Sequence, residues 1–294
     1  MKEIYVKLIF IIIILIIVPY IDIPKEKQEI KEEKEIIVTI TINNQNIKKE
    51  MDEYLLGVVA GEMPAHFEEE AIKAQVVASR TFVMSRNLKV DNTTNTQVYL
   101  TDKQMREKWK DHYNEYKDKI SKAIKDTHNE VMTYEGKYIS ALFFASSNGY
   151  TNNCEDYFSG GKPYLKSVKS EWDLVEDQNN CRKKNFKVEE LKKIFDINTL
   201  SFDILSYTES GYVKEIIIGD KSYTGREVRE LLGLASSSFK IEYNKNGYTF
   251  ITSGYGHGVG MSQYGAQGMA KEKKSYKDIL NHYYKNIKIE SIEL

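Results

Sequence analysis

Residues 54–82 read YLLGVVAGEMPAHFEEEAIKAQVVASRTF and predict the centre of the fold. Apolar side chains recur in it at helical spacing, and Pro64 interrupts them because proline cannot continue the hydrogen-bond ladder of a helix. The sequence therefore predicts two consecutive helices, one over about 52–63 and one from 66 or 67 to about 87. Small side chains on the inner face of the second helix predict that another element packs closely against it, or that its backbone lies near a cleft.

Helices and strands alternate along the rest of the chain. The predicted elements are helices at 103–114, 119–127, 191–195 and 263–271, hairpins at 132–144 and 239–252, a strand at 36–42, a helix between Thr224 and Gly233, and a long loop at 145–170. Thr224 and Glu227 form a capping box, and the glycine at 233 ends that helix. The predicted class is α+β, with helices around β-hairpins and residues 200–250 as a small inserted subdomain.

A membrane anchor is predicted at the N-terminus. Every residue from 8 to 18 is apolar, and with its flanks the run is long enough to span a bilayer. Lys2 and Lys7 precede it, which predicts that the rest of the chain lies outside the cytoplasm. A cleaved signal peptide is the alternative, but no small-x-small cleavage site follows. The predicted parts are a transmembrane anchor at 1–23, a charged stalk at 24–35 and one extracytoplasmic domain at 36–294.

Composition excludes nucleic acid as a partner, and it does not decide whether the two cysteines form a disulfide or bind a metal. The formal net charge is -1, and without clustered Lys and Arg the chain is not expected to bind nucleic acid. Cys154 and Cys181 lie in the part predicted to be extracytoplasmic, where a disulfide is favoured. Metal ligation is the alternative, although the paired spacing of a zinc ribbon is absent.

Glu62 is the candidate acid. It falls in the last turn of the first predicted helix, where unpaired carbonyls and the negative end of the helix dipole disfavour a carboxylate. Partial burial would raise its pKa as well, which a general acid near neutral pH requires. The alternative is an exposed glutamate with no chemical role.

The second predicted helix carries three polar candidates. Arg80 lies among small and apolar side chains, where an unpaired charge is costly, so we expect a carboxylate partner or a bound ligand there. Lys73 lies on the same face, four residues after Glu69, and a surface ion pair is the alternative for it. Gln75 points elsewhere, and an ordinary polar surface position is its alternative.

A glycine-rich motif follows near the C-terminus and reads GYGHGVGMSQYGA at residues 254–266. Its alternating glycines let the backbone approach a ligand closely and adopt unusual dihedral angles. His257 is held on this loop. Ser262, Gln263 and Tyr264 begin a helix whose N–H groups could bind oxygen atoms. The Gly and Lys order of a phosphate-binding loop is absent.

These two motifs resemble the stage II sporulation protein D family. The stretches SSNGYT at 146–151 and PYLKSV at 163–168 resemble the family's middle motif. The resemblance extends from about residue 36 to the C-terminus, with the motifs in the family's order. One departure is clear: where the family usually has a histidine after an aromatic residue, this chain reads FFASSNG at 143–149.

The resemblance implies a lytic transglycosylase that cleaves peptidoglycan between N-acetylmuramic acid and N-acetylglucosamine and leaves 1,6-anhydro ends. Glu62 maps onto the family's catalytic glutamate, and Arg80 maps onto an active-site arginine. The expected substrate contacts are Lys73, Gln75, Ser147, His257, Ser262, Gln263 and Tyr264. No metal and no cofactor are expected.

The resemblance also implies a cellular setting. Members of the family are anchored in the mother-cell membrane, face the forespore during engulfment, and act with a peptidoglycan amidase and a polytopic membrane protein. Glycan strands stripped of their stem peptides are the preferred substrate.

Three other functions fit the same residues. A hydrolase would use Glu62 with a second carboxylate, such as Asp156 or Asp173, and would leave reducing ends. A non-catalytic protein would bind glycan, activate a cell-wall amidase and leave strand length unchanged. A metal site would require Cys154, Cys181 and a histidine to converge.

Overall fold

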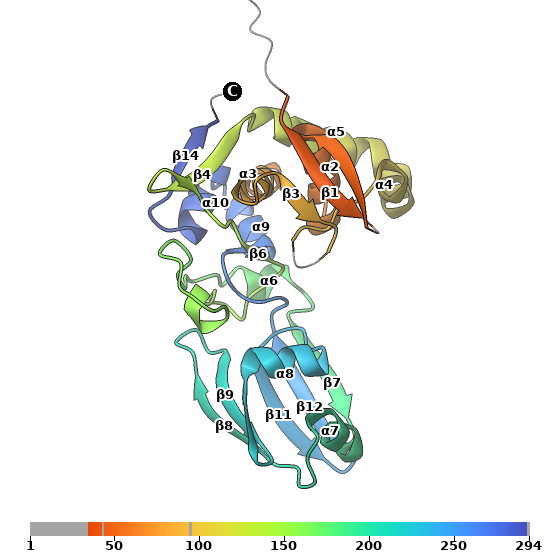
Figure 1. Ribbon diagram of the computed structural model, residues 1–294, viewed down its shortest axis with the longest axis vertical. Coiled ribbons are helices and arrows are strands. Elements are labelled where there is room, and N and C mark those ends of the chain that lie inside the picture. The colour runs from red at the N-terminus through yellow and green to blue at the C-terminus, as the bar shows by residue number, and fades with distance from the viewer. Residues whose placement is uncertain (1–34, 43, 94–95, 293–294) are drawn as a thin grey trace, which may run out of the picture. The chain divides into compact units, whose positions relative to one another are not determined.

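The computed structural model describes residues 35–42, 44–93 and 96–292 (Figure 1). The helices are α2 (Met51–Glu62), α3 (Glu69–Ser85), α4 (Asp102–Trp109), α5 (Tyr113–Asp126), α6 (Asp173–Glu176), α7 (Val188–Phe195), α8 (Gly225–Leu232), α9 (Gln263–Lys271) and α10 (Tyr276–Tyr283), with the 3-10 helices η2 (Lys110–His112) and η3 (Cys154–Asp156). The strands are β1 (Ile37–Ile42), β2 (Gln45–Glu50), β3 (Lys89–Asp91), β4 (Glu130–Tyr134), β5 (Lys137–Tyr138), β6 (Phe143–Phe144), β7 (Cys181–Phe186), β8 (Phe202–Tyr207), β9 (Val213–Ile218), β10 (Lys221–Thr224), β11 (Phe239–Asn244), β12 (Gly247–Ser253), β13 (Met261–Ser262) and β14 (Lys288–Ser291). The predicted α+β class is confirmed.

The strands of the described residues form five small sheets. Their orders are β2-β1-β3, β10-β9-β8, β11-β12-β7, β13-β6 and β14-β4-β5. The pairs β1–β3 and β13–β6 are parallel, and the others are antiparallel. The predicted strand from 137 to 144 is therefore wrong as one unit, because its second half leaves the hairpin and pairs with the glycine-rich motif at β13.

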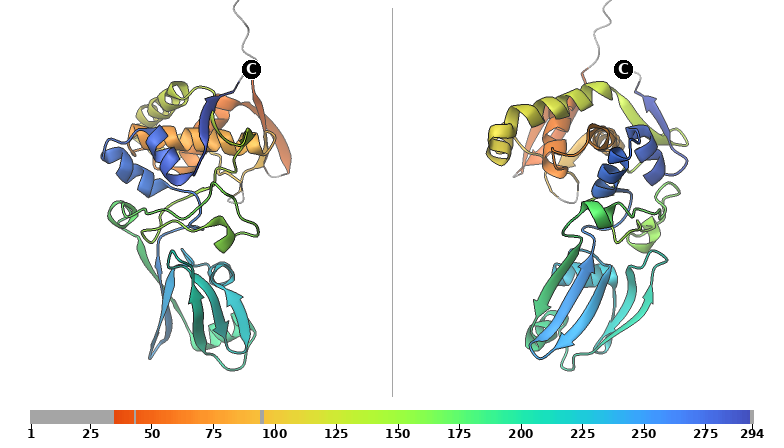
Figure 2. Two further views of the ribbon diagram at one scale, coloured as in Figure 1. Left: turned by 90° about the vertical axis from the view of Figure 1, so that its left-hand side faces the viewer. Right: turned by 180° about the vertical axis from the view of Figure 1, so that it is seen from behind.

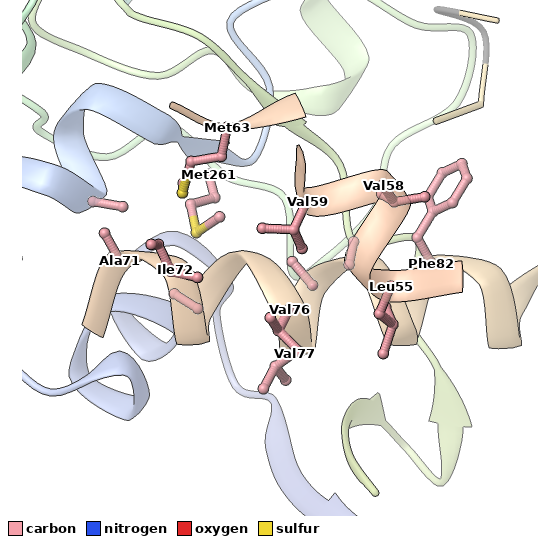
Figure 3. Close-up of a cluster of buried hydrophobic side chains, with 14 of the residues drawn as sticks. Leu55, Val58, Val59, Met63, Ala71, Ile72, Val76, Val77, Phe82 and Met261 are labelled. Carbon is pink, nitrogen blue, oxygen red and sulfur yellow. The ribbon is translucent and has the colours of Figure 1, made fainter. Parts of the chain in front are cut away.

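The larger core forms where α2 packs against α3. Leu55, Val58 and Val59 on α2 are buried together with Val76 and Val77 on α3 (Figure 3). Fully burying an aliphatic side chain of this size stabilises the fold by about 1.5–3 kcal/mol. Because the small inner residues of α3 admit close neighbours, α5, α9 and α10 also contact this helix. The close packing that the sequence predicted is thus present.

The helix α3 begins at residue 69 and ends at 85, so it is shorter at both ends than predicted. The N–H of Phe67 bonds the carbonyl of Pro64 (3.0 Å), which makes a separate turn before the helix. Gln267 on α9 accepts the N–H of Glu68 (2.6 Å), and this remote contact fixes the helix start. At the other end, Asn87 and Leu88 take positive φ angles, which an α-helix excludes.

A segment from 96 to 100 crosses over α2 at two glycines. A Cβ atom at Gly61 would overlap the carbonyl oxygen of Val98, and one at Gly57 would overlap the ring of Tyr99. The N–H of Leu100 also bonds the carbonyl of Gly57 (3.0 Å). The two glycines therefore let the backbone of this segment lie directly on the helix, next to Glu62.

A second, smaller core lies among β7 to β12, α7 and α8. Its buried residues include Phe186, Leu191, Ile216, Val228 and Phe250. It begins at β7, before the predicted start of the subdomain at residue 200, because the whole of β7 pairs with β12. The predicted capping box of α8 is confirmed, and the residue at 233 ends the helix with a left-handed conformation (φ 56°), which favours glycine.

The predicted loop at 145–170 contains little regular structure beyond η3, and the stretch from 145 to 180 lies between the two groups of elements in both views (Figure 2). The predicted helix at 263–271 is confirmed as α9. None of the helices in the described ranges combines the length and apolarity needed to cross a bilayer. The anchor predicted at 1–23 lies outside the described residues, as does nearly all of the predicted stalk.

Candidate active site

Glu62 lines a cavity of about 770 Å³, a size suited to a small-molecule ligand or a short piece of a polymer. The wall is built from segments far apart in sequence. It includes β6, the stretch after η3, the loop at 255–257, the start of α9 and one face of α8. Glu62 comes to this wall because α2 ends there, two residues before Pro64.

The carboxylate of Glu62 is half-buried and held by one backbone donor. The N–H of Val98 donates to Oε1 at 2.5 Å. Lys108 lies nearby and donates to the carbonyl of Ala60 (2.7 Å), which caps the end of α2. Burial raises the pKa of Glu62, and the Val98 N–H and the charge of Lys108 offset part of that increase. This environment favours a glutamic acid that can hold a proton nearer to neutral pH than an exposed one.

His257 lines the same cavity and is half-buried among three aromatic rings, those of Phe144, Tyr157 and Phe158. Burial, with the charge of Arg229 next, lowers its pKa to about 4. The N–H of Val259 donates to Nδ1 (3.1 Å), so in the neutral ring the proton sits on Nε2. His257 is thus neutral at physiological pH, and a hydrogen bond with the backbone of Phe143 offsets part of the lowering of its pKa.

Four cations line the cavity, against two carboxylates. The cations are Arg86, Lys162, Arg226 and Arg229, and the carboxylates are Glu62 and Glu230. Glu230 is paired with Arg226 (2.8 Å). Arg229 is half-buried and donates to the hydroxyl of Tyr157 (2.8 Å) and the carbonyl of Ala235 (3.3 Å). Among the described residues no carboxylate pairs with Arg229, so the cavity carries excess positive charge suited to an anionic ligand group.

Gln263 is the second predicted contact that lines the cavity. Its Nε2 donates to Oε1 of Gln75 (3.1 Å), and Gln75 in turn donates to Ser79 (3.1 Å). Gln75 is completely buried, so its alternative as an ordinary surface residue is wrong. Gln75 acts on the cavity wall through Gln263 and does not line the cavity itself.

Ser147 and Ser262 point away from the cavity. Both hydroxyls donate to the carboxylate of Asp173 at 2.5 Å, one to each oxygen. The hydroxyl of Ser262 also accepts the N–H of Gly265 (3.2 Å), and the N–H of Tyr264 bonds the carbonyl of Ala145 (3.0 Å). These N–H groups of α9, which we expected to bind ligand oxygens, are therefore occupied by the protein. The ring of Tyr264 packs edge-on against Phe67, outside the cavity wall.

Arg80 and Lys73 also lie outside the wall of the cavity. The guanidinium of Arg80 is buried and donates to the carbonyls of Thr127 (2.7 Å) and Glu130 (3.1 Å), so it joins α3 to the region between α5 and β4. Backbone carbonyls, and not the expected carboxylate or ligand, are therefore the partners of Arg80. Lys73 forms the ion pair with Glu69 (3.5 Å) that was its alternative, and it also pairs with Glu70 and Asp126.

The carboxylates considered for a hydrolase are both outside the wall that contains Glu62. Asp173 is fully buried. Asp156 lines a second cavity of about 460 Å³ that shares Tyr157, Phe158, Arg226 and Glu230 with the first.

The two cysteines are free thiols, so the disulfide that composition favoured is not formed. Cys154 is buried in the wall of the larger cavity, whereas Cys181 is exposed on β7. Within the described ranges no group of three or more His, Cys, Asp or Glu side chains is arranged to hold a metal ion.

Sequence reasoning missed the residues that α8 and the stretch after η3 bring to the cavity. Arg226 and Arg229 are three residues apart, so helical spacing alone places them on one face of α8. The spacing of the two arginines could therefore have predicted that they act together. In contrast, no local pattern connects this helix to Glu62, more than 160 residues earlier in the chain.

The comparisons with known proteins agree with the resemblance. The sequence profile described as Stage II sporulation protein matches residues 42–134. Stage II sporulation protein D of Bacillus amyloliquefaciens is 41% identical over 254 residues, which cover 81% of this chain and 74% of that protein. The chain belongs to the stage II sporulation protein D family.

Two further relatives extend this comparison. Stage II sporulation protein D of Bacillus subtilis (strain 168) is 39% identical over 261 residues, covering 84% of this chain and 76% of that protein. A Bacillus subtilis protein named Amidase enhancer is 30% identical over 291 residues, covering 78% of this chain but only 39% of that protein. The likeness to the second protein is thus confined to part of its length.

Proposed function

We propose that this protein is a lytic transglycosylase that cleaves the glycan strands of peptidoglycan, with Glu62 as its single acid and base. The observation that carries the proposal is the environment of Glu62. It is half-buried in a cavity, burial raises its pKa, and one of its oxygens already accepts the Val98 N–H at 2.5 Å. The other oxygen is then the one to exchange a proton with a substrate.

The chemistry needs one group that first gives and then takes a proton. Protonated Glu62 donates to the glycosidic oxygen between N-acetylmuramic acid and N-acetylglucosamine as that bond breaks. The substrate's own acetamido group stabilises the positive charge that develops at the anomeric carbon. The carboxylate of Glu62 then takes the proton of the muramic C6 hydroxyl, whose oxygen closes the 1,6-anhydro ring, and Glu62 is protonated again.

The carboxylates of the cavity favour this reaction over hydrolysis by two carboxylates. Most glycoside hydrolases place a second carboxylate opposite the acid. The other carboxylate of this cavity, Glu230, is paired with Arg226. His257, with its pKa lowered to about 4, is neutral and does not replace Glu62 as the acid.

The positive charge of the cavity supports a strand without stem peptides as the substrate. Removing the peptide exposes a free carboxylate on the lactyl group of each muramic residue. Arg229 has no carboxylate partner among the described residues and lies with Arg226 on the cavity face of α8. An arginine can bind such a carboxylate through two parallel hydrogen bonds. We infer that α8 contributes to the preference for stripped strands.

The test is to incubate the protein with peptide-free glycan strands and to analyse the products by mass spectrometry. We expect 1,6-anhydro ends from the wild type and none from Glu62→Gln, whose fold is checked by urea unfolding. Reducing ends would instead indicate hydrolysis. Arg229→Met should lower affinity for stripped strands more than for peptide-bearing strands. Arg106→Met, an exposed arginine on α4, serves as the matched control.

The second candidate is a non-catalytic glycan-binding protein that activates a cell-wall amidase. The likeness to the protein named Amidase enhancer favours it. In this case strands would remain intact in the assay above, binding would persist in Glu62→Gln, and addition of the protein would raise the rate of a purified amidase. Retention of wild-type strand cleavage by Glu62→Gln would rule out the catalytic role of Glu62.

Two relatives are named Stage II sporulation protein D, and on that basis we propose a role in engulfment, together with an amidase and a polytopic membrane protein. We also propose that residues 1–23 anchor the chain in the mother-cell membrane, with the rest facing the forespore. A protease added to intact protoplasts should then degrade the domain, and protection of the domain would contradict this orientation.

A further inference from the structure

The short helix α6 carries a buried carboxylate that joins two distant segments of the chain. Asp173 is fully buried, and its two oxygens accept the hydroxyls of Ser147 and Ser262 at 2.5 Å each. One serine lies before α6 in the middle motif, and the other precedes α9 at the end of the glycine-rich motif. The mechanism proposed above makes no use of Asp173.

Neighbouring polar groups continue the same connection. Asp177, just after α6, accepts the hydroxyl of Ser146 (2.5 Å). Ser146 and Tyr255 exchange two backbone hydrogen bonds, at 2.7 and 3.1 Å. The side chain of Asn180 accepts the N–H of Gly254 (3.1 Å). Both ends of the segment 254–262 are therefore anchored to the region around α6.

The sequence of the segment 254–262 does not fix one backbone conformation, so hydrogen bonds from other segments are needed to hold it. Its four alternating glycines all have positive φ angles, from 80° to 121°. Glycine restricts the backbone little, so local propensity does not fix one conformation. The side chains next to the anchors line the cavity of Glu62: His257 lies between them, and Gln263 directly follows Ser262.

The apolar side chains of α6 are mostly exposed, so apolar packing is not what holds this helix in place. Its two apolar side chains, Leu174 and Val175, are 53% and 77% exposed, so their burial does not secure the helix. A buried carboxylate is a costly way to stabilise a fold, and apolar residues in such places often stabilise it more. Burial also raises the pKa of Asp173 to about 6, which reflects this cost.

We propose that Asp173 is a positioning residue: by holding Ser147 and Ser262 it sets the placement of His257 and Gln263 in the cavity wall. The kinetic part of the proposal rests on the proposed function. The structural part, the anchoring of the segment 254–262, can be tested without any activity.

Asp173→Asn is the variant that separates positioning from stability. Asparagine has the same shape and no charge, but an NH2 group replaces one of the two carboxylate oxygens, so one of the two serine hydroxyls loses the acceptor that it has in the wild type. The full-length protein carrying Asp173→Asn should unfold at a urea concentration no lower than the wild type at pH 7.5. Its kcat/KM on peptide-free glycan should nevertheless fall about tenfold. Thr81→Ala is the control, because it removes a buried hydroxyl that binds Val77 and Met132, and none of these three residues lines the cavity. It should lower stability and leave kcat/KM within twofold.

Amide hydrogen exchange of the segment 254–262 is the readout that does not depend on activity. We expect the hydrogen-bonded amides of Tyr255 and Met261 to exchange about tenfold faster in Asp173→Asn than in Thr81→Ala. Equal exchange in the two variants would overturn the proposal, even if the wild type proved inactive on glycan. With an active wild type, a kcat/KM within twofold of wild type for Asp173→Asn would also overturn it.

Discussion

The protonation of His257 should make the stability of the protein depend on pH in a way that one substitution removes. Burial and the charge of Arg229 lower the pKa of His257 to about 4, against 6.5 for the free side chain. The unfolded chain therefore takes up this proton before the folded chain does, and stability is lost as pH falls from about 6.5 towards 4. In His257→Asn the side chain stays neutral, and its oxygen can still accept the Val259 N–H that Nδ1 accepts in the wild type.

The magnitude follows from the two pKa values. The full difference of 2.5 units corresponds to about 3.4 kcal/mol. Between pH 7.5 and pH 5.0, the linkage relation gives a loss of about 2 kcal/mol from this group alone. Every other titrating group is common to the two proteins, so the difference between their pH dependences isolates His257.

The assay is urea unfolding at pH 7.5 and 5.0, followed by the fluorescence of the two tryptophans. The free energy of unfolding of the wild type should fall by about 2 kcal/mol more than that of His257→Asn, with equal m-values. In an Arg229→Met background this difference should shrink, because Arg229 is the second cause of the lowered pKa. If wild type and His257→Asn respond to pH within about 0.5 kcal/mol of each other, the burial of a neutral His257 is wrong.

Three further predictions concern residues around the site. Asp173→Asn should show the opposite pH dependence: with the pKa of Asp173 raised from 3.8 to about 6, the wild type should gain about 1.4 kcal/mol relative to the variant from pH 7.5 to 5.0 in the same urea assay. No gain would contradict the buried carboxylate. Gly61→Ala should push Val98 off α2, cost about 1–3 kcal/mol, and shift the loss of glycan cleavage at high pH to a higher pH, because Glu62 loses the N–H that lowers its pKa. Gly161→Ala, where a Cβ meets ordinary contacts, is its control, and an unshifted pH profile would speak against the role of Val98. Arg80→Met should lower the free energy of unfolding by about 2–4 kcal/mol, because the carbonyls of Thr127 and Glu130 lose a buried charged donor. Cleavage per folded molecule should stay near wild type, whereas a large loss would favour the active-site role that the resemblance implies.

Local patterns predicted the elements that local forces fix. Pro64 ends one helix, the capping box of Thr224 and Glu227 starts another, and the glycine at 233 ends it, since each acts through neighbours within four residues. The boundary of α3 was misplaced because a contact from α9, to Glu68, sets it. The strand predicted at 137–144 was misplaced for the same reason, since its second half pairs with β13, far along the chain.

Local sequence patterns were enough to predict the α+β class, the family and Glu62 as the candidate acid, because the residues next to Glu62 place it at a helix end. The direction of the loop side chains was decided by tertiary structure alone. Ser147 and Ser262 lie in motifs typical of a site, yet both turn to Asp173, 26 and 89 residues away. Arg229 reaches the cavity only because the inserted subdomain packs α8 there. A buried carboxylate must find its donors wherever the fold brings them, and no spacing along the chain records which segments will meet.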